Sequence, residues 1–381
     1  MADKLFTRRD FLKTCGKGVS LLALFSGVIR FDAPARAESE KPLFANDLIR
    51  GEDQLKVIFL EKKHPEKSDA FFILYLSENG LDITLHDGGF DDSNTYKALS
   101  NLRKEILDSA GVADTPGAYR LNMRLVISHF HTDHVQGLNG MILRTNRKFA
   151  ISEVYAPPAT CLPLGIYDDA ENSDVVERPD FMYAMKTYHP DTPIHILDYG
   201  ETCLVPTDIG EMRLFAPVND WGTDEKIKMF SHVYGYKDRY NYLEAIPICA
   251  VNANSLWMRV ALDDYSFLFT GDVEKRNEDR LDEPMDEMIA EYGEALRSDI
   301  IKYPHHGQIR DAAAKIIRRK LITKKEQAIC ILTASDGWQD AGVALSRLSM
   351  RWFDLEKGSI LYTVKNNAIS HQVVKGATAF L

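Results

Sequence analysis

The sequence is poor in cysteine and has no long hydrophobic run. Its five cysteines are scattered over 381 residues and form no Cys-x-x-Cys pair, which disfavours both a disulfide framework and a thiolate zinc site. The apolar stretch at residues 18–29 includes serine and glycine, and it is shorter than the ~20 apolar residues that a transmembrane helix needs. We therefore expect a globular chain without a stable membrane span.

Several catalytic signatures are also missing. The sequence contains no Gly-x-Ser-x-Gly elbow, no Walker sequence and no dinucleotide-binding glycine pattern. Positive charge is in deficit, because 46 Lys and Arg residues face 56 Asp and Glu residues. A broad basic surface that coats nucleic acid is therefore disfavoured. The remaining composition, 45% hydrophobic and 27% charged, is typical of a globular protein with a sizeable core.

The first 37 residues have the character of an export signal. Residues 7–13 place Arg8 and Arg9 ahead of a Phe-Leu-Lys triplet and resemble the twin-arginine consensus. The apolar stretch and an Ala-x-Ala site at residues 35–37 follow, so we expect cleavage before Glu38. This pattern predicts transport by the twin-arginine translocase to the periplasm or the exterior. The segment holds seven basic and three acidic residues, so its removal takes the net charge from −10 to −14.

Short apolar runs of strand type alternate with helical patterns along the rest of the chain. Strands are expected at residues 55–60, 71–76, 83–85, 125–128, 151–155, 212–215, 256–262, 267–270, 300–303, 328–332 and 360–364. Helices are expected at residues 94–108, 180–188, 274–297, 311–321 and 343–354. The alternation predicts sheets covered by helices in one α/β domain at residues 52–381, after a lead-in at residues 38–51.

Metal-ligand residues are concentrated directly after the apolar run at residues 125–128. His129 and His131 are two positions apart, so an extended backbone directs both to one side. Asp133 and His134 follow where the chain must turn, and these adjacent residues can face a second point. One short loop can thus supply two ligands to each of two ions. Imidazole and carboxylate groups suit zinc, and also manganese or iron.

This His-x-His-x-Asp-His pattern resembles the signature of the metallo-β-lactamase superfamily. The family fold is a single-domain αββα sandwich, with two mixed sheets flanked by helices, and its site lies where loops from the two sheets meet. By this resemblance, Asp87 orients metal-binding histidines and Asp272, after a strand-like run, bridges two divalent ions, with zinc expected. In a closing Pro-His-His-Gly motif, His305 is assigned as a ligand and His306 as a contact to the substrate or the transition state. The expected metal ligands are therefore His129, His131, Asp133, His134, Asp272 and His305.

The combination of motifs indicates a subgroup. The segment from Asn252 to Leu256, followed by Thr-Gly-Asp and Pro-His-His-Gly, resembles the hydrolase domain of ComEC-type DNA-uptake proteins and the bacterial phosphorylcholine esterases. Many superfamily members have a third histidine for the first metal near this segment, where this chain has asparagines. The first metal therefore has fewer protein ligands here, and Asn254 is expected beside the ligands rather than among them.

Three histidines lie between the motifs: His189, His195 and His232. His232 is the best candidate for a spare ligand, although a surface or capping role is expected for all three. The tyrosines around His232 fit either a pocket wall or ordinary packing.

The resemblance implies an exported hydrolase that uses a metal-bound hydroxide. Asp133 would bind and orient the metal, and His306 would stabilise developing negative charge. A small-molecule or cell-surface phosphodiester is the favoured substrate, and nucleic acid is not favoured at a charge of −14. Two alternatives stay open: the same site acting on a lactone, β-lactam or thioester, or a catalytically inactive binding module of this fold. Retention of the complete ligand set argues against the inactive module.

Overall fold

The computed structural model describes most of the chain beyond residue 43. The described ranges are residues 44–61, 69–89, 92–115, 119–144, 148–158, 178–223, 225–226, 250–307, 311–323, 328–333, 340–355 and 358–374. The predicted export signal, His232 and the tyrosines around it lie outside these ranges. Among the described helices, none is both long enough and apolar enough to cross a membrane.

The first sheet is mixed and is ordered β15-β14-β1-β2-β3-β4-β5-β6. Its strands are β1 (Gln54–Phe59), β2 (Phe71–Ser77), β3 (Gly80–His86), β4 (Leu121–Val126), β5 (Phe149–Ala156), β6 (Ile194–Ile196), β14 (Ser359–Lys365) and β15 (Ala368–Val374). The pairs from β15 to β3 are antiparallel, whereas β3, β4, β5 and β6 run parallel. Because β3 and β4 are parallel neighbours, the residues that follow each of them meet at one edge of the sheet.

The second sheet is also mixed and is ordered β13-β12-β11-β10-β9-β8-β7. Its strands are β7 (Thr202–Leu204), β8 (Glu211–Phe215), β9 (Trp257–Leu262), β10 (Tyr265–Phe269), β11 (Ile300–Lys302), β12 (Ile329–Leu332) and β13 (Arg351–Asp354). Here β10, β11, β12 and β13 are parallel, so the segments after β10 and β11 are again neighbours.

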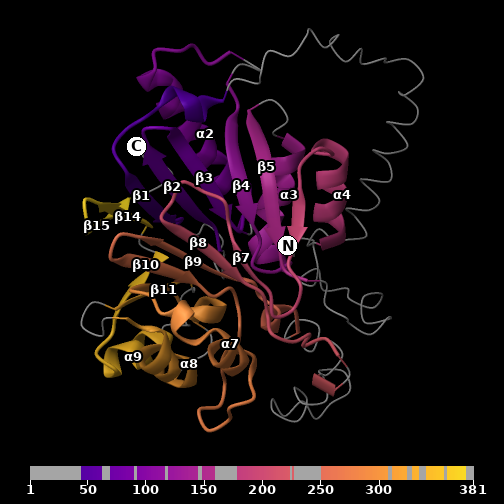
Figure 1. Cartoon of the computed structure of the whole chain (residues 1–381), viewed down its shortest axis with the longest axis vertical. Coiled ribbons are helices and arrows are strands. Elements are labelled where there is room, and N and C mark those ends of the chain that lie inside the picture. Colours follow the sequence, from indigo (N-terminus) through magenta and orange to yellow (C-terminus); the bar gives the residue numbers. More distant parts are fainter. Residues whose placement is uncertain are drawn as a thin grey trace, which may run out of the picture.

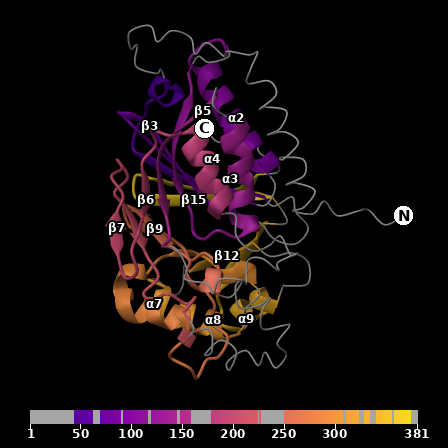
Figure 2. The ribbon, with the colours of Figure 1, turned by 90° about the vertical axis from the view of Figure 1, so that its right-hand side faces the viewer.

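Helices cover the outer faces of both sheets, as Figures 1 and 2 show. The first sheet carries α2 (Asp92–Ser109), α3 (Thr132–Arg144) and α4 (Arg178–Tyr188), and the second carries α7 (Pro284–Tyr292), α8 (Asp311–Ile316) and α9 (Asp340–Arg347). Short helical turns lie at Ala45–Leu48, Gly293–Leu296, Pro304–Gly307 and Ile317–Leu321. This arrangement confirms the predicted αββα sandwich of two mixed sheets flanked by helices.

Alternation along the strands builds three apolar layers. In β1, Leu55, Val57 and Phe59 point into the layer between the two sheets, while Ile58 points into the layer beneath the helices of the first sheet. Both faces of β1 are therefore buried, which explains why its apolar residues form a nearly continuous run. The third layer lies between the second sheet and its helices.

The helix predicted at residues 274–297 is wrong at its N-terminal side, because α7 begins only at Pro284. Proline suits the first turn of a helix, where no intrahelical N–H bond is lost. The Glu283 side chain caps this helix, and it also accepts hydrogen bonds from the backbone N–H groups of Arg276 and Asn277. The polar residues ahead of Pro284 therefore form a loop tied to the cap.

The helix predicted at residues 343–354 is wrong at its C-terminal side. The helix α9 ends at Arg347, and Trp352 belongs to strand β13. There the indole covers Gly342, where an added Cβ would lie 2.6 Å from the ring. The apolar spacing that suggested one long helix thus comes from a short helix packed on the strand that follows it.

Candidate metal centre

The His-x-His-x-Asp-His loop leaves β4 and enters α3. Ser128 fixes the start of this loop from two sides. Its backbone oxygen accepts from the N–H of Leu256, just before β9 (2.7 Å), and its own N–H donates to Asp87 Oδ1 (2.8 Å). The loop is thus tied to β3 of the first sheet and to β9 of the second.

Asp87 follows β3 directly and binds His134. Its Oδ2 atom lies 2.8 Å from His134 Nδ1 and 2.6 Å from Ser128 Oγ, and all three residues are buried. Burial alone would raise the pKa of Asp87, but the imidazoles of His86 and His134 hold it well below its ordinary value. Because a carboxylate only accepts, the Nδ1 atom of His134 carries the hydrogen, and in the neutral ring Nε2 keeps the lone pair that a metal needs.

Asp272, just after β10, lies at the centre of a buried cluster. Its Oδ2 atom is 3.3 Å from His134 Nε2 and 2.9 Å from His306 Nε2. The same His306 nitrogen is 2.9 Å from Asp133 Oδ2. Asp133 and His134 follow the first sheet, whereas Asp272 and His306 follow the second, so the cluster forms only when the two sheets pack together.

Opposite charges in this cluster shift one another's pKa values. Burial disfavours a charged imidazole, yet the carboxylates around it, Asp272 first, raise the pKa of His134 well above its ordinary value and that of His306 to about 10. Burial likewise disfavours a charged carboxylate, but the cationic groups of His306 and Lys302 hold the pKa of Asp272 well below its ordinary value. Without a bound ion, the cluster is therefore held together by protonated histidines.

His305 and His306 diverge although they are adjacent. Both have a left-handed backbone, with φ of 48° and 54°, so the chain turns sharply after β11. His306 reaches the cluster around Asp272. His305 instead places Nδ1 3.1 Å from Glu274 Oε1, and its Nε2 lies 3.4 Å from Asn252 Nδ2. The structure thus brings His306, rather than the favoured His305, to the other candidate ligands.

His129 and His131 form a second group next to this cluster. Their Nε2 and Nδ1 atoms are 3.1 Å apart, and the His129 ring centroid lies 4.0 Å from that of His134. Burial and the neighbouring imidazoles hold the pKa of His129 well below its ordinary value. Its ring is therefore neutral near pH 7, which is the form that binds metals.

The asparagine segment before β9 contacts the site through residues other than the expected one. Asn254 accepts from the N–H of Trp221 and donates to Asp220, both at 3.1 Å, so its side chain fixes that loop. Asn252 reaches His305, and its buried Oδ1 atom has no hydrogen bond. Ser255 Oγ accepts from the N–H of Asp272 at 3.1 Å. Asn252 and Ser255 thus take the place beside the ligands that was expected for Asn254.

Two buried charged residues that were given no role from the sequence complete the cluster. Lys302, at the end of β11, places Nζ 2.5 Å from Asp69 Oδ2 and 2.9 Å from Asp272 Oδ1. Asp69, just before β2, places Oδ1 3.2 Å from His306 Nδ1. The sequence feature that could have indicated Lys302 is its position at the end of an apolar run, two residues before the Pro-His-His-Gly motif.

The residues of the cluster fit a divalent metal ion. One ligand atom from each of Asp69, His134, Asp272 and His306 lies within 4.8 Å of the others. The buried Nε2 atoms of His134 and His306 face Asp272 Oδ2 at 3.3 Å and 2.9 Å. A divalent cation held by these nitrogens and oxygens would replace the protons that link them when no ion is bound. Nitrogen and oxygen donors together suit zinc, manganese or iron.

The histidines between the motifs lie elsewhere. His195 is in β6 and stacks on Tyr155, with ring centroids 4.7 Å apart. His189 follows α4, and its backbone N–H donates to Met185 (2.8 Å). His232 lies outside the described residues, so its role as a spare ligand stays a prediction.

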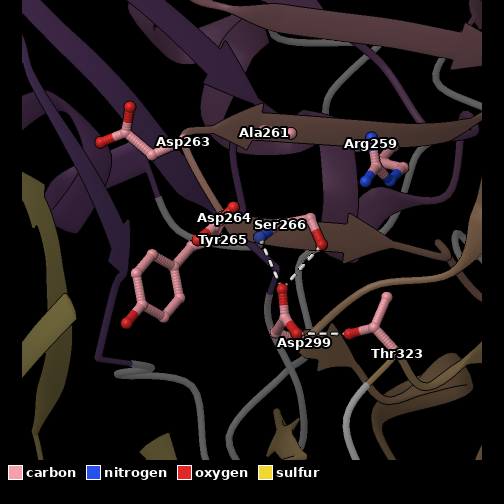
Figure 3. A pocket seen from close by; sticks show the side chains of 8 residues that line it. All are labelled: Arg259, Ala261, Asp263, Asp264, Tyr265, Ser266, Asp299 and Thr323. Carbon is pink, nitrogen blue, oxygen red and sulfur yellow. Dashed lines mark hydrogen bonds between the residues drawn. The ribbon is translucent and has the colours of Figure 1, made fainter. Parts of the chain in front are cut away.

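A separate pocket lies at the start of β10, at the opposite end of that strand from Asp272 (Figure 3). Asp299 in its wall accepts from both the N–H and the hydroxyl of Ser266 at 2.9 Å, and it also binds Thr323. None of the residues that line this pocket has an unsatisfied buried polar side-chain atom. We therefore place the candidate site at the histidines.

Comparison with known proteins yields coarse likeness only. No protein-family model matches the chain, and no curated protein matches it in sequence. Among solved structures, Tm1679, described as a metal-dependent hydrolase of the β-lactamase superfamily, is 13% identical, with a TM-score of 0.39 over 80% of this chain and 96% of its own. Unliganded yeast PDE1 is 12% identical, with a TM-score of 0.46 over 79% of this chain and 97% of its own. The metallo-β-lactamase SMB-1 is 11% identical, with a TM-score of 0.30 over 80% of this chain and 97% of its own. Function is therefore inferred from the site itself.

Proposed function

We propose that the chain is a metal-dependent hydrolase. The observation that carries this proposal is the convergence of two imidazoles on one carboxylate oxygen. The Nε2 atoms of His134 and His306 both face Asp272 Oδ2, and both side chains are buried. Neutral imidazole nitrogens and carboxylate oxygens that converge in this way are the donor set of a divalent metal ion.

Two ions are proposed, each held by one part of the loop after β4. Asp133 and His134, with His306 from the second sheet, hold one ion. His129 and His131 would hold the other, and the resemblance implies that Asp272 would serve both. When bound, such cations act as Lewis acids that stabilise negative charge and lower the pKa of water.

The chain's own residues prepare the site for these ions. Asp87 fixes the orientation of His134 through Nδ1, so that Nε2 faces Asp272. His305 is held at Nδ1 by Glu274, which leaves Nε2 as the nitrogen that can contact a substrate. This assignment exchanges the roles expected from the sequence, because His306 becomes the ligand and His305 the substrate contact.

A phosphodiester is the proposed substrate, and it is supported by the resemblance of the Asn252–Leu256, Thr-Gly-Asp and Pro-His-His-Gly motifs to phosphodiester-cleaving relatives. The net charge of −14 after signal removal favours a small or cell-surface molecule over long nucleic acid. A lactone, β-lactam or thioester is the alternative, because the same metal chemistry serves a carbonyl carbon.

The test combines metal analysis with a substrate panel. We expect the purified protein to bind zinc or manganese and to hydrolyse bis-p-nitrophenyl phosphate, with no comparable turnover of a lactone or a β-lactam. Asp133→Asn should reduce hydrolysis to the background rate, whereas Asp264→Asn, an exposed carboxylate of the separate pocket, should not. Turnover of the lactone alone would establish the alternative substrate class. Metal binding without any turnover would establish the inactive module.

Export through the twin-arginine translocase is proposed as well, and it is supported by the sequence of residues 7–13 and 35–37. In cell fractionation, the wild-type chain should appear outside the cytoplasm in a form that begins at Glu38. Replacement of Arg8 and Arg9 by lysine should retain the uncleaved chain inside. Normal export of that variant would contradict the proposal.

A further inference from the structure

Lys302 is a buried cation with three oxygen partners. Its side chain is 0% exposed, and Nζ lies 2.5 Å from Asp69 Oδ2, 2.9 Å from Asp272 Oδ1 and 2.8 Å from the backbone oxygen of Gly271. Burial disfavours its charge, but Asp272 and Asp69 together raise the pKa of Lys302 above its ordinary value. The ammonium group is therefore charged in the folded protein.

We propose that Lys302, together with Asp69, is a positioning pair that presents one oxygen of Asp272 and one nitrogen of His306 to the metal ions. This inference rests on the proposed function, since it assigns a role at the same site. Asp69 lies within ligand distance of His134, Asp272 and His306. Its two oxygens face Lys302 and Nδ1 of His306, so we assign it to positioning.

The two oxygens of Asp272 are assigned to different partners. Oδ1 is held by Lys302, whereas Oδ2 faces the Nε2 atoms of His134 and His306. Lys302 also binds the carbonyl of Gly271, so both the backbone and the side chain of this turn are fixed by one ammonium group. Rotation of the Asp272 carboxylate would break the contact at Oδ1, which keeps Oδ2 directed at the histidines.

Asp69 extends the same constraint to His306. Its Oδ2 atom binds Lys302, and its Oδ1 atom lies 3.2 Å from His306 Nδ1. The same Nδ1 atom lies 2.9 Å from the hydroxyl oxygen of Thr333, so a carboxylate and a hydroxyl together engage Nδ1 and leave Nε2 of the neutral ring as the ligand atom. Asp69 comes from the first sheet and Lys302 from the second, so the pair also joins the two halves of the site.

Stability alone does not explain this pair. A buried ion pair is often no more stabilising than well-packed apolar residues of similar volume, because desolvation offsets the attraction between the charges. Apolar side chains at positions 69 and 302 would serve the core equally well. They would leave Oδ1 of Asp272 without its ammonium partner and Nδ1 of His306 with only the Thr333 hydroxyl.

The chain offers a matched control in Lys275. This lysine is 1% exposed on its side chain and lies 2.6 Å from Asp286 and 3.3 Å from Glu283, so it is another buried lysine between two carboxylates. Its partners hold the start of α7 and include none of the candidate ligands. Lys302→Met and Lys275→Met therefore remove comparable buried charges. Of the two lysines, only Lys302 contacts Asp272.

The experiment measures zinc affinity by chelator competition on the purified full chain, with folding checked by circular dichroism. We expect Lys302→Met to weaken binding by about 10- to 100-fold, as loss of a partner behind a metal ligand does, while Lys275→Met binds as the wild type. Asp69→Asn/Lys302→Met should also bind more weakly than Asp69→Asn, because Lys302 still holds Asp272 in the latter.

The outcomes separate this inference from the proposed function. Zinc binding by Lys302→Met that equals or exceeds the wild type would overturn the positioning role, as would equal binding by Asp69→Asn and the double variant. Where Lys302→Met does not fold, Asp69→Asn decides, because zinc affinity equal to that of the wild type would overturn the role of Asp69. A wild-type chain that binds no metal would instead overturn the proposed function.

Discussion

The Nδ1 atom of His134 lies 2.8 Å from Oδ2 of Asp87, across the parallel strands β3 and β4. The two residues are far apart in the sequence, and the parallel pairing of β3 with β4, together with the loop from Ser128 into α3, brings them together. The contact gives the ring of His134 a fixed orientation before any ion binds. The site is therefore preorganised on the side of the first sheet.

Asp87→Asn should weaken metal binding by about 10- to 100-fold, since the substitution removes the charge behind a ligand but preserves side-chain shape. Asparagine also tolerates the left-handed backbone of this position, where φ is 57°. Isothermal titration with zinc measures the effect. Asp82→Asn is the control. Asp82 lies elsewhere on β3 and pairs with Arg124 of β4, which is not a candidate ligand. Equal losses in the two variants would argue for a general effect on folding.

His306→Asn and His305→Asn should separate the two adjacent histidines. Asparagine accepts the left-handed backbone at both positions, so the comparison isolates the side chains. We expect His306→Asn to bind fewer ions per chain, and His305→Asn to keep the wild-type number while losing turnover. Metal content after dialysis and hydrolysis rates measure this. Loss of an ion in His305→Asn alone would restore the assignment made from the sequence.

Metal binding should release protons near neutral pH. In the metal-free protein the pKa of His306 is raised to about 10 and that of His134 is also raised, so both rings are protonated at pH 7. An imidazole must lose its proton to bind a metal at Nε2. Apparent affinity should therefore rise with pH up to about pH 10, as expected from the raised pKa of His306.

Calorimetric titration in two buffers of different ionisation enthalpy, such as Tris and HEPES, counts these protons. We expect the observed enthalpy at pH 7 to differ between the two buffers, because the released protons are taken up by buffers of different ionisation enthalpy. A binding enthalpy that is the same in both buffers at pH 7 would contradict protonated ligands.

Gly137→Ala should destabilise the fold near the site. An added Cβ at this position of α3 would lie 2.0 Å from the carbonyl oxygen of Gly88, which follows Asp87. Overpacking of this kind costs ~1–3 kcal/mol in the free energy of unfolding. Urea denaturation measures the loss. Gln136→Ala, at the preceding exposed position of the same helix, should leave the midpoint nearly unchanged.

The strands that precede the motifs were predictable because each signal is local, whereas β7, β13 and β15 were not predicted as strands. An apolar run that ends in His129, Asp272 or His305 identifies both the strand and the ligand type in one short window. Whether these short segments come together in space depends on the order of the strands in each sheet. Only the resemblance to a known family predicted that order. The helix α3 was not predicted, because its first turn contains Asp133 and His134 and so was interpreted as a metal-binding loop.

Asp69 and Lys302 were not predictable from local pattern. Each lies at one end of an apolar strand, where a charged residue ordinarily faces solvent, and their pairing depends on the packing of one sheet on the other. The choice between His305 and His306 had the same difficulty. The backbone angles decide where two adjacent side chains point. Both histidines have left-handed backbone angles here, and a sequence pattern does not predict these angles.

The left-handed backbone of His305 and His306 also bears on how far this protein can be stabilised. A residue with a Cβ in that region costs about 1–2 kcal/mol relative to the ordinary helical region, and glycine avoids this cost. Selection for thermal stability alone would therefore favour glycine at these two positions. The same substitutions would remove the two imidazoles and reduce activity. Engineering for robustness should leave this turn untouched and should seek its gains in the helices on the outer faces.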